Sequence, residues 1–204
     1  MSEIRHVVFD LGRVLIEWEP EIPYRRLIPD ATERRRFLTE VCNARWLIET
    51  DLGATWADAE RDLIARHPGE ADLIRAFREN WHDMVPGFVD GTPLILSELI
   101  SHGHDVTALT NFAGDTFYEV ADRFPLLRSF RGVTVSGRVG LVKPDEAIFK
   151  RHTDDFDMAP EATLFFDDTP ANVAAAHRAG WRAELFTNAE TMRQDLKRYG
   201  IKID

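Results

Sequence analysis

The chain has 204 residues, of which 44% are hydrophobic, so it can form one core domain with an insertion or two small domains. Its formal net charge of -10 argues against a general nucleic-acid-binding or anionic-membrane-binding surface, because both need a basic face. Cys42 is the single cysteine, which rules out an intrachain disulfide. With no leader-like start and no apolar stretch of spanning length, the sequence predicts a soluble, cytoplasmic protein.

Five short apolar or β-branched runs predict strands. They are continuously apolar rather than alternating, which favours strands buried on both faces, as in a parallel sheet. The runs are Val7–Phe9, Asp105–Leu109, Gly132–Val135, Thr163–Phe166 and Ala183–Phe186.

Helical patterns lie between these runs. Two of them, Thr92–Gly103 and Thr169–Gly180, begin with a Thr cap followed by Pro and end at Gly. The segments "DEAIFKRHTDDF" and "NAETMRQDLKRYG" predict two more helices. This strand–helix alternation predicts a doubly wound, Rossmann-like α/β fold with a parallel sheet.

The connection between the first and second predicted strands is too long for a loop. Residues 17–86 carry apolar side chains at helical spacing on a charged background, which predicts an inserted helical-bundle cap domain. Residues 1–16 and 87–204 would then form the α/β core domain. Four of the five tryptophans lie in or beside the insertion. They are expected in its core, with the alternative that Trp18 or Trp46 lines a lid over a substrate.

Polar side chains stand where several predicted strands end. In an open parallel sheet the carboxyl ends of the strands meet at one edge, where ligands bind. These side chains are therefore expected to converge there, although each one alone is an ordinary turn or cap residue. They are Asp10 after the first strand, Thr110 and Asn111 after the second, Lys143 beyond the third, and Asp167 and Asp168 after the fourth.

Such a group suits chemistry on a phosphate ester. Asp10 can attack phosphorus and form a covalent aspartyl-phosphate, which divides one displacement into two easier ones. The attack brings anions together, so we expect Mg²⁺, bound by Asp10, by Asp167 and by the main-chain carbonyl of Gly12. Asp168 is expected to orient metal-bound water or to pair with Lys143.

The remaining polar groups would hold the phosphate. Lys143 offers positive charge to the phosphoryl oxygens and to Asp10. Thr110, Asn111 and nearby backbone N–H groups are expected to bind the other oxygens.

The same residues resemble the haloacid dehalogenase-like (HAD) hydrolase superfamily. "VVFDLGRVL", "ALTN", "GLVKPDEAIF" and "LFFDD" are similar to its four motifs, and the resemblance spans essentially the whole chain. It implies a Rossmann-like core with a helical cap, Asp10 as nucleophile, Thr110 as phosphate binder, Lys143 as charge stabiliser, and Asp167 as Mg²⁺ ligand supported by Asp168.

The sequence departs from the family at Gly12. Most phosphatases of the superfamily carry an aspartate two residues after the nucleophile, where it protonates the leaving group and later activates water. Loss of a general acid costs about 10²–10⁴ in rate, and a good leaving group reduces that cost. The Asp-Leu-Gly pattern is similar to a branch that includes sugar-1-phosphate phosphatases. No replacement acid stands out among residues such as Glu17, Glu19 and His82.

The sequence therefore predicts a Mg²⁺-dependent phosphatase for a small phosphorylated metabolite, with sugar phosphates among the candidates. One alternative is a 2-haloacid dehalogenase that uses Asp10 as nucleophile and groups such as Arg13 and Trp18 for halide. Another is a phosphate-binding or regulatory protein with little turnover, because Gly12 replaces the acid. No oligomeric state is predicted.

Overall fold

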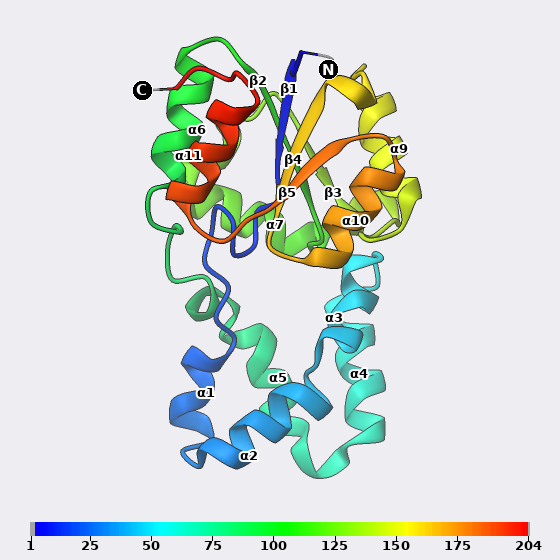
Figure 1. Ribbon diagram of the computed structural model, residues 1–204. Coiled ribbons are helices and arrows are strands. Elements are labelled where there is room, and N and C mark those ends of the chain that lie inside the picture. Colours follow the sequence, from blue (N-terminus) through cyan, green and yellow to red (C-terminus); the bar gives the residue numbers. More distant parts are fainter. Residues whose placement is uncertain (1–2, 204) are drawn as a thin grey trace.

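The computed structural model describes residues 3–203 and contains a five-stranded sheet in the order β3-β2-β1-β4-β5, with every neighbouring pair parallel (Figure 1). The strands are β1 (His6–Phe9), β2 (Asp105–Thr110), β3 (Val133–Val135), β4 (Thr163–Asp167) and β5 (Arg182–Leu185). The predicted doubly wound α/β fold is confirmed, and each strand begins within one residue of the predicted run.

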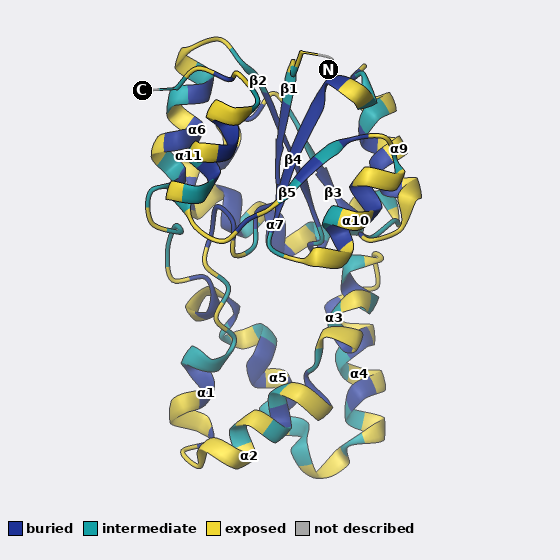
Figure 2. Cartoon of the chain, in the orientation of Figure 1, coloured by how far each residue is buried: buried dark blue, intermediate teal, exposed yellow. Residues whose placement is uncertain are grey.

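Both faces of the sheet are covered, which explains the continuously apolar strands. Phe9 and Phe166 pack into one hydrophobic cluster, while Val8 and Phe165 point to the other face and into a second cluster. Figure 1 shows one pair of helices on each side of the sheet, and Figure 2 shows the strands almost wholly buried between them. The pairs are α6 (Thr92–Ser101) with α11 (Ala189–Arg198), and α9 (Glu146–Asp155) with α10 (Pro170–Arg178).

Local details differ from the prediction. Thr92 does not cap α6: Gly91 precedes the helix with φ of 78°, and the Thr92 hydroxyl donates to the carbonyl of Val89 at 2.9 Å. Two helices were not predicted, α7 (Gly114–Arg123) and α8 (Ser136–Val139), and two short 3₁₀ segments lie at Pro125–Ser129 and Pro160–Ala162.

The chain between β1 and α6 is helical, as predicted. It contains α1 (Glu21–Leu27), α2 (Ala31–Arg36), a π-helical turn (Phe37–Val41), α3 (Ala44–Asp51), α4 (Trp56–Arg66), a 3₁₀ turn (Pro68–Glu70), α5 (Ala71–Glu79) and a further 3₁₀ turn (Trp81–Met84). None of the helices formed by residues 3–203 is long and apolar enough to cross a lipid bilayer.

Aromatic rings form the centre of this insertion. Phe77 on α5 lies with its ring centroid 5.2 Å from that of Trp46, 6.2 Å from Trp56 and 6.0 Å from Trp81. The indole N–H of Trp46 donates to the Ala59 carbonyl at 3.0 Å, and only 2% of Trp46 is exposed. Trp46 is therefore a core residue, and the alternative that it lines a lid is wrong.

The insertion is joined to the rest of the molecule on one side and packs against it on the other. Where the chain enters and leaves, the Glu17 N–H donates to Gly87 O at 2.9 Å and the Val89 N–H donates to Leu15 O at 3.0 Å. On the far side α3 approaches α8, and a Cβ added at Gly53 would lie only 3.1 Å from the carbonyl oxygen of Gly137. Gly53 also has φ of 101°. Glycine is therefore favoured there for two reasons, the lack of space for a Cβ and the left-handed backbone.

Candidate active site

Strand register brings Asp10 and Asp167 together. Phe9 is paired with Phe166, so the next residue on each strand, Asp10 and Asp167, share one level and one face of the sheet. The Asp10 N–H donates to Phe166 O at 2.9 Å and fixes that level. β1 and β4 are also the strands between which the chain order reverses, where open α/β sheets bind ligands.

Lys143 lies between the two carboxylates. Its Nζ is 2.8 Å from Asp10 Oδ1 and 2.7 Å from Asp167 Oδ2, and only 1% of the lysine side chain is exposed. Burial opposes the charged amine, but the two carboxylates outweigh it and raise the pKa of Lys143 above its ordinary value. The amine is therefore a fixed positive charge at the end of β1.

Asn111 holds the main chain of Lys143. The Lys143 N–H donates to Asn111 Oδ1 at 2.8 Å, and Asn111 Nδ2 donates to the Lys143 carbonyl at 2.9 Å. The side chain predicted to bind substrate thus supports the lysine. Thr110, one residue earlier at the end of β2, is 1% exposed.

The two acids after β4 are in different environments. Both oxygens of Asp167 accept hydrogen bonds, from the Thr169 N–H at 2.8 Å and from Asn172 Nδ2 at 3.0 Å, in addition to Lys143. Asp168 is half-buried and accepts a 3.2 Å bond from the Thr169 hydroxyl. Lys143 therefore pairs with Asp167, and the expectation that it pairs with Asp168 is wrong.

The contacts of the Asp10 carboxylate lie on one oxygen. Oδ1 accepts the Leu11 N–H at 2.7 Å and faces Lys143, and among the described residues no hydrogen-bond donor reaches Oδ2. Burial raises the pKa of Asp10 to about 7, and the charge on Asp167 adds to that shift while Lys143 opposes it. One face of the carboxylate is thus anchored and the other is left for a ligand.

The residues at this edge suit a divalent cation. One carboxylate oxygen from each of Asp10, Asp167 and Asp168 lies within 4.8 Å of the others. Hard oxygen donors of this kind are what Mg²⁺ prefers, usually one or two carboxylates together with water and substrate oxygens. Three acids and one ammonium leave a local excess of negative charge, so the group fits the ion.

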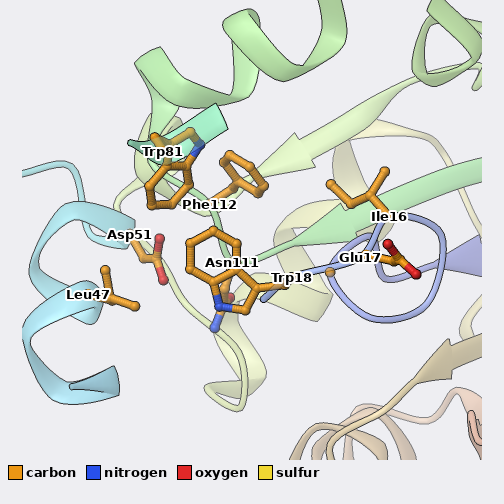
Figure 3. A pocket seen from close by; sticks show the side chains of 9 residues that line it. Ile16, Glu17, Trp18, Leu47, Asp51, Trp81, Asn111 and Phe112 are labelled. Atoms are coloured by element: carbon orange, nitrogen blue, oxygen red, sulfur yellow. The ribbon is translucent and has the colours of Figure 1, made fainter. Parts of the chain in front are cut away.

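A cavity of about 120 Å³ lies between the core and the insertion, and its wall includes Gly12, two residues after Asp10, and Asn111, which bonds to Lys143 (Figure 3). The core contributes residues after β1 and β2, and the insertion contributes residues from α3 and from its two ends. Its walls are Gly12, Ile16, Glu17, Trp18, Leu47, Asp51, Trp81, Asn111 and Phe112. The alternative that Trp18 faces a substrate space is therefore consistent with the structure.

Asp51 is the cavity residue that sequence reasoning missed. It lies four residues after Leu47 on α3, so both side chains share the face that lines the cavity. Burial raises the pKa of Asp51 to about 7, with Lys143 acting in the opposite direction. Of the earlier acid candidates, Glu17 lines the cavity, whereas Glu19 and His82 are exposed and do not.

Gly12 leaves room at the position where an acid is expected. A Cβ added there would meet nothing within 4 Å, and Gly12 forms part of the cavity wall.

The family model of haloacid dehalogenase-like hydrolases matches residues 53–185, which is more than half of the chain.

The chain belongs to the haloacid dehalogenase-like hydrolases.

Two curated relatives of this HAD-like hydrolase have phosphatase-type names. Flavin mononucleotide hydrolase 1 of Arabidopsis thaliana is 26% identical over 169 residues, covering 77% of this chain and 66% of the plant protein. The chain thus spans slightly less than two thirds of that relative. Sesquiterpene phosphatase astK of Aspergillus oryzae is 25% identical over 191 residues, covering 88% of each protein.

Solved structures show the same fold. A predicted HAD-like hydrolase from Porphyromonas gingivalis has a TM-score of 0.73 at 24% identity and covers 98% of this chain and 100% of its own. A HAD family enzyme from Bacteroides thetaiotaomicron, in complex with magnesium and inorganic phosphate, has a TM-score of 0.70 at 23% identity, covering 91% and 95%. L-2-haloacid dehalogenase from Xanthobacter autotrophicus scores 0.69 at 17% identity, covering 98% and 84%.

Proposed function

We propose that this HAD-like hydrolase is a Mg²⁺-dependent phosphatase that hydrolyses a small phosphomonoester through a covalent aspartyl-phosphate on Asp10. The observation that carries the proposal is the bridging of Asp10 and Asp167 by the buried amine of Lys143, beside a third carboxylate. An aspartate that attacks carbon needs no neighbouring carboxylates. An aspartate that attacks an anionic phosphate does need them, because they hold the cation that offsets the negative charges.

The different contacts of Asp167 and Asp168 support different roles for the two acids. Asp167 is fully enclosed and bonded to Asn172 and Lys143, so we assign it to the positioning of Lys143 and, with one oxygen, to the cation. Asp168 is more open and carries a single weak bond, so we assign it, with Asp10 and the Gly12 carbonyl, to the cation. When bound, Mg²⁺ would offset the repulsion between the phosphate and these carboxylates.

Asp10 and Lys143 would act on the phosphoryl group. The free oxygen of Asp10 attacks phosphorus while the other stays anchored to the Leu11 N–H and Lys143. Lys143 holds positive charge next to the oxygens that gain negative charge. Thr110, at the end of β2, is assigned to the binding of the phosphate oxygens, and Asn111, the next residue, to the positioning of Lys143.

The cavity supports a leaving group with an apolar face. Trp18, Trp81 and Phe112 give it aromatic walls, and the ring centroids of Trp18 and Trp81 are 4.6 Å apart. The hydrocarbon face of a sugar, a flavin or an isoprenoid would pack there. We propose that residues 17–86 act as a cap domain that supplies this specificity to a core of residues 1–16 and 87–204. The cytoplasmic location stays a prediction.

Phosphate release tests the function. With Mg²⁺ supplied, the protein should hydrolyse p-nitrophenyl phosphate and at least one member of a panel of sugar 1-phosphates, flavin mononucleotide and prenyl monophosphates. A chelator and Asp10→Asn should each abolish release. Asp154→Asn is the matched control, since that acid is exposed on α9 and pairs with Lys150. No release across the panel would contradict the proposal.

Two further outcomes would favour the alternatives. Halide release from 2-chloropropionate in the presence of a chelator would indicate a dehalogenase. A phosphorylated protein that accumulates in an intact-mass spectrum without turnover would indicate a phosphate-binding or regulatory role.

A further inference from the structure

Hydrolysis of an unactivated phosphate ester needs a proton donor, and the described acidic residues of the core at the sheet edge already have other roles. When the bond between phosphorus and the ester oxygen breaks, the leaving alkoxide must gain a proton, and an acid placed for this adds about 10²–10⁴ in rate. Gly12 has no side chain. Asp167 is enclosed and Lys143 is bound to two carboxylates, so neither is free to deliver a proton to a leaving group.

The insertion places one carboxyl group in the space that Gly12 leaves open. Asp51 and Gly12 line the same cavity from two different parts of the chain. Asp51 lies on α3 of the insertion, and Gly12 lies in the core segment after β1. In Figure 3 the Asp51 carboxyl projects from α3 toward Trp18 and Asn111, whereas the Glu17 carboxylate lies on the far side of Trp18. Asp51 is therefore the acid that faces the interior of the cavity.

The backbone around Asp51 is held against the core. Asn43 caps α3 by accepting the Trp46 N–H at 3.0 Å, and Trp46 anchors the opposite face of the helix in the insertion core. Directly after α3, Gly53 packs against the Gly137 carbonyl. These contacts fix the height of Asp51 above the sheet edge.

Burial favours the neutral form of Asp51 at moderate pH. Burial is the largest influence on its pKa, which is about 7, and Lys143 opposes it without cancelling it. On the elements that pack against α3, Arg66 of α4 lies 3.7 Å from Glu49, and Arg138 of α8 lies over the ring of Tyr118 at 3.8 Å. Glu17, the other acid in the wall, is exposed, and its carboxylate lies on the far side of Trp18.

We propose that Asp51 is the general acid and base of the reaction, supplied from the insertion in place of a side chain at position 12; this rests on the proposed phosphatase function. As an Asp10 oxygen bonds to phosphorus, the ester P–O bond breaks and its electron pair goes to the leaving oxygen, which takes the Asp51 proton. The Asp51 carboxylate then accepts a proton from water as that water attacks phosphorus, which releases phosphate and restores both aspartates.

Leaving-group dependence tests this role. Asp51→Asn should lower kcat/KM for an alkyl phosphate about 10²–10⁴-fold, because the alkoxide then leaves unprotonated. It should change kcat/KM for 2,4-dinitrophenyl phosphate only a few-fold, since that leaving group needs no proton. The activity on the activated ester also reports that the variant is folded. For the alkyl ester, the fall in wild-type kcat/KM as pH rises through about 7 should be absent in Asp51→Asn.

A rescue and a matched control complete the design. Gly12→Asp has room for its side chain and should restore at least about tenfold of the alkyl-ester rate in the Asp51→Asn background. Glu49→Gln, on the same helix and 42% exposed, should leave both esters unaffected. Equal slowing of both esters, or of neither, by Asp51→Asn and by Asp51→Ser would overturn the inference. Absence of wild-type activity on the activated ester would instead remove the phosphatase function itself.

Discussion

The side-chain amide of Asn111 pairs with both main-chain polar groups of Lys143, at 2.8 Å and 2.9 Å. The lysine therefore owes its position to the end of β2 as well as to the acids it bridges. Asn111→Ala should lower kcat about 10–100-fold, because the amine would no longer be held where charge develops. Phosphate release under saturating substrate measures this effect.

The control for Asn111 is Asn188→Ala. Asn188 caps α11 by accepting the Thr191 N–H at 2.9 Å, so its loss should cost about 1 kcal/mol of stability with no change in kcat. Equal kcat values for the two variants would contradict a positioning role for Asn111.

Lys143→Met should destabilise the protein as well as inactivate it. The variant leaves Asp10 and Asp167 buried without their cation, and removal of one partner of a buried ion pair costs about 3–5 kcal/mol. Lys150→Met, at a lysine whose side chain is 75% exposed, should cost less than about 1 kcal/mol. Urea denaturation of both variants without divalent cations provides the comparison, and similar midpoints would count against the buried bridge.

Metal binding should be visible without turnover. A ligand that binds only the folded state at 100 times its Kd stabilises it by about 2.7 kcal/mol, so Mg²⁺ should raise the wild-type Tm. Asp168→Asn should reduce that rise while leaving the metal-free Tm almost unchanged, because Asp168 is half-buried with one weak bond. Asp154→Asn should keep the full rise. An undiminished Mg²⁺ effect in Asp168→Asn would remove it from the ligand set.

Asp51 should make the protein less stable at neutral pH than at pH 4. Its pKa is raised from 3.8 to about 7 by burial, so between these values the unfolded chain ionises while the folded protein keeps the proton. Stability is then lost as pH rises through this window. Asp51→Asn should therefore be more stable than the wild type by about 1–3 kcal/mol at pH 8, allowing for partial exposure, and equal to it near pH 4. Denaturant titrations at the two pH values measure the difference.

His152 should make the protein less stable as pH falls, the opposite of the effect of Asp51. It is fully buried between the hydroxyls of Thr107 at 2.9 Å and Thr134 at 2.8 Å, and burial lowers its pKa from 6.5 to about 3. As pH falls through this range, the unfolded chain gains a proton that the folded protein does not. The free energy of unfolding therefore falls by about 4–5 kcal/mol in all. The stability gap between wild type and His152→Gln should therefore shrink on acidification. A constant stability difference between the two proteins from pH 7.5 to 4 would contradict the lowered pKa of His152.

The sheet edge could be predicted because it depends on strands. Apolar runs end at Asp10, Thr110 and Asp167, and parallel pairing brings the ends of such runs to one level whatever the rest of the chain does. Lys143 was expected there from its place after the third strand, and the structure puts its amine between Asp10 and Asp167. Their roles in the reaction stay predictions.

The cavity could not be predicted in the same way. Asp51 is one of many acids on amphipathic helices, and its burial arises only when α3 folds back onto the glycine at position 137. Asn172, which bonds to both oxygens of Asp167, was missed because it reads as an ordinary helical residue. Trp46 and Trp18 look alike in the sequence, yet one is core and the other lines the cavity. Contacts between distant segments decide each of these cases.

The chain crosses between core and insertion twice, and both crossings run side by side at Leu15–Glu17 and Gly87–Val89 (Figure 1). The opposite margin, where Gly53 meets Gly137, has no covalent link. A tilt of the insertion about the paired crossings would thus open a gap that is widest at α3, the helix that bears Asp51. Under the role proposed for Asp51, entry of a substrate and withdrawal of the proton donor would be a single movement, so that the open molecule would not protonate a departing alcohol.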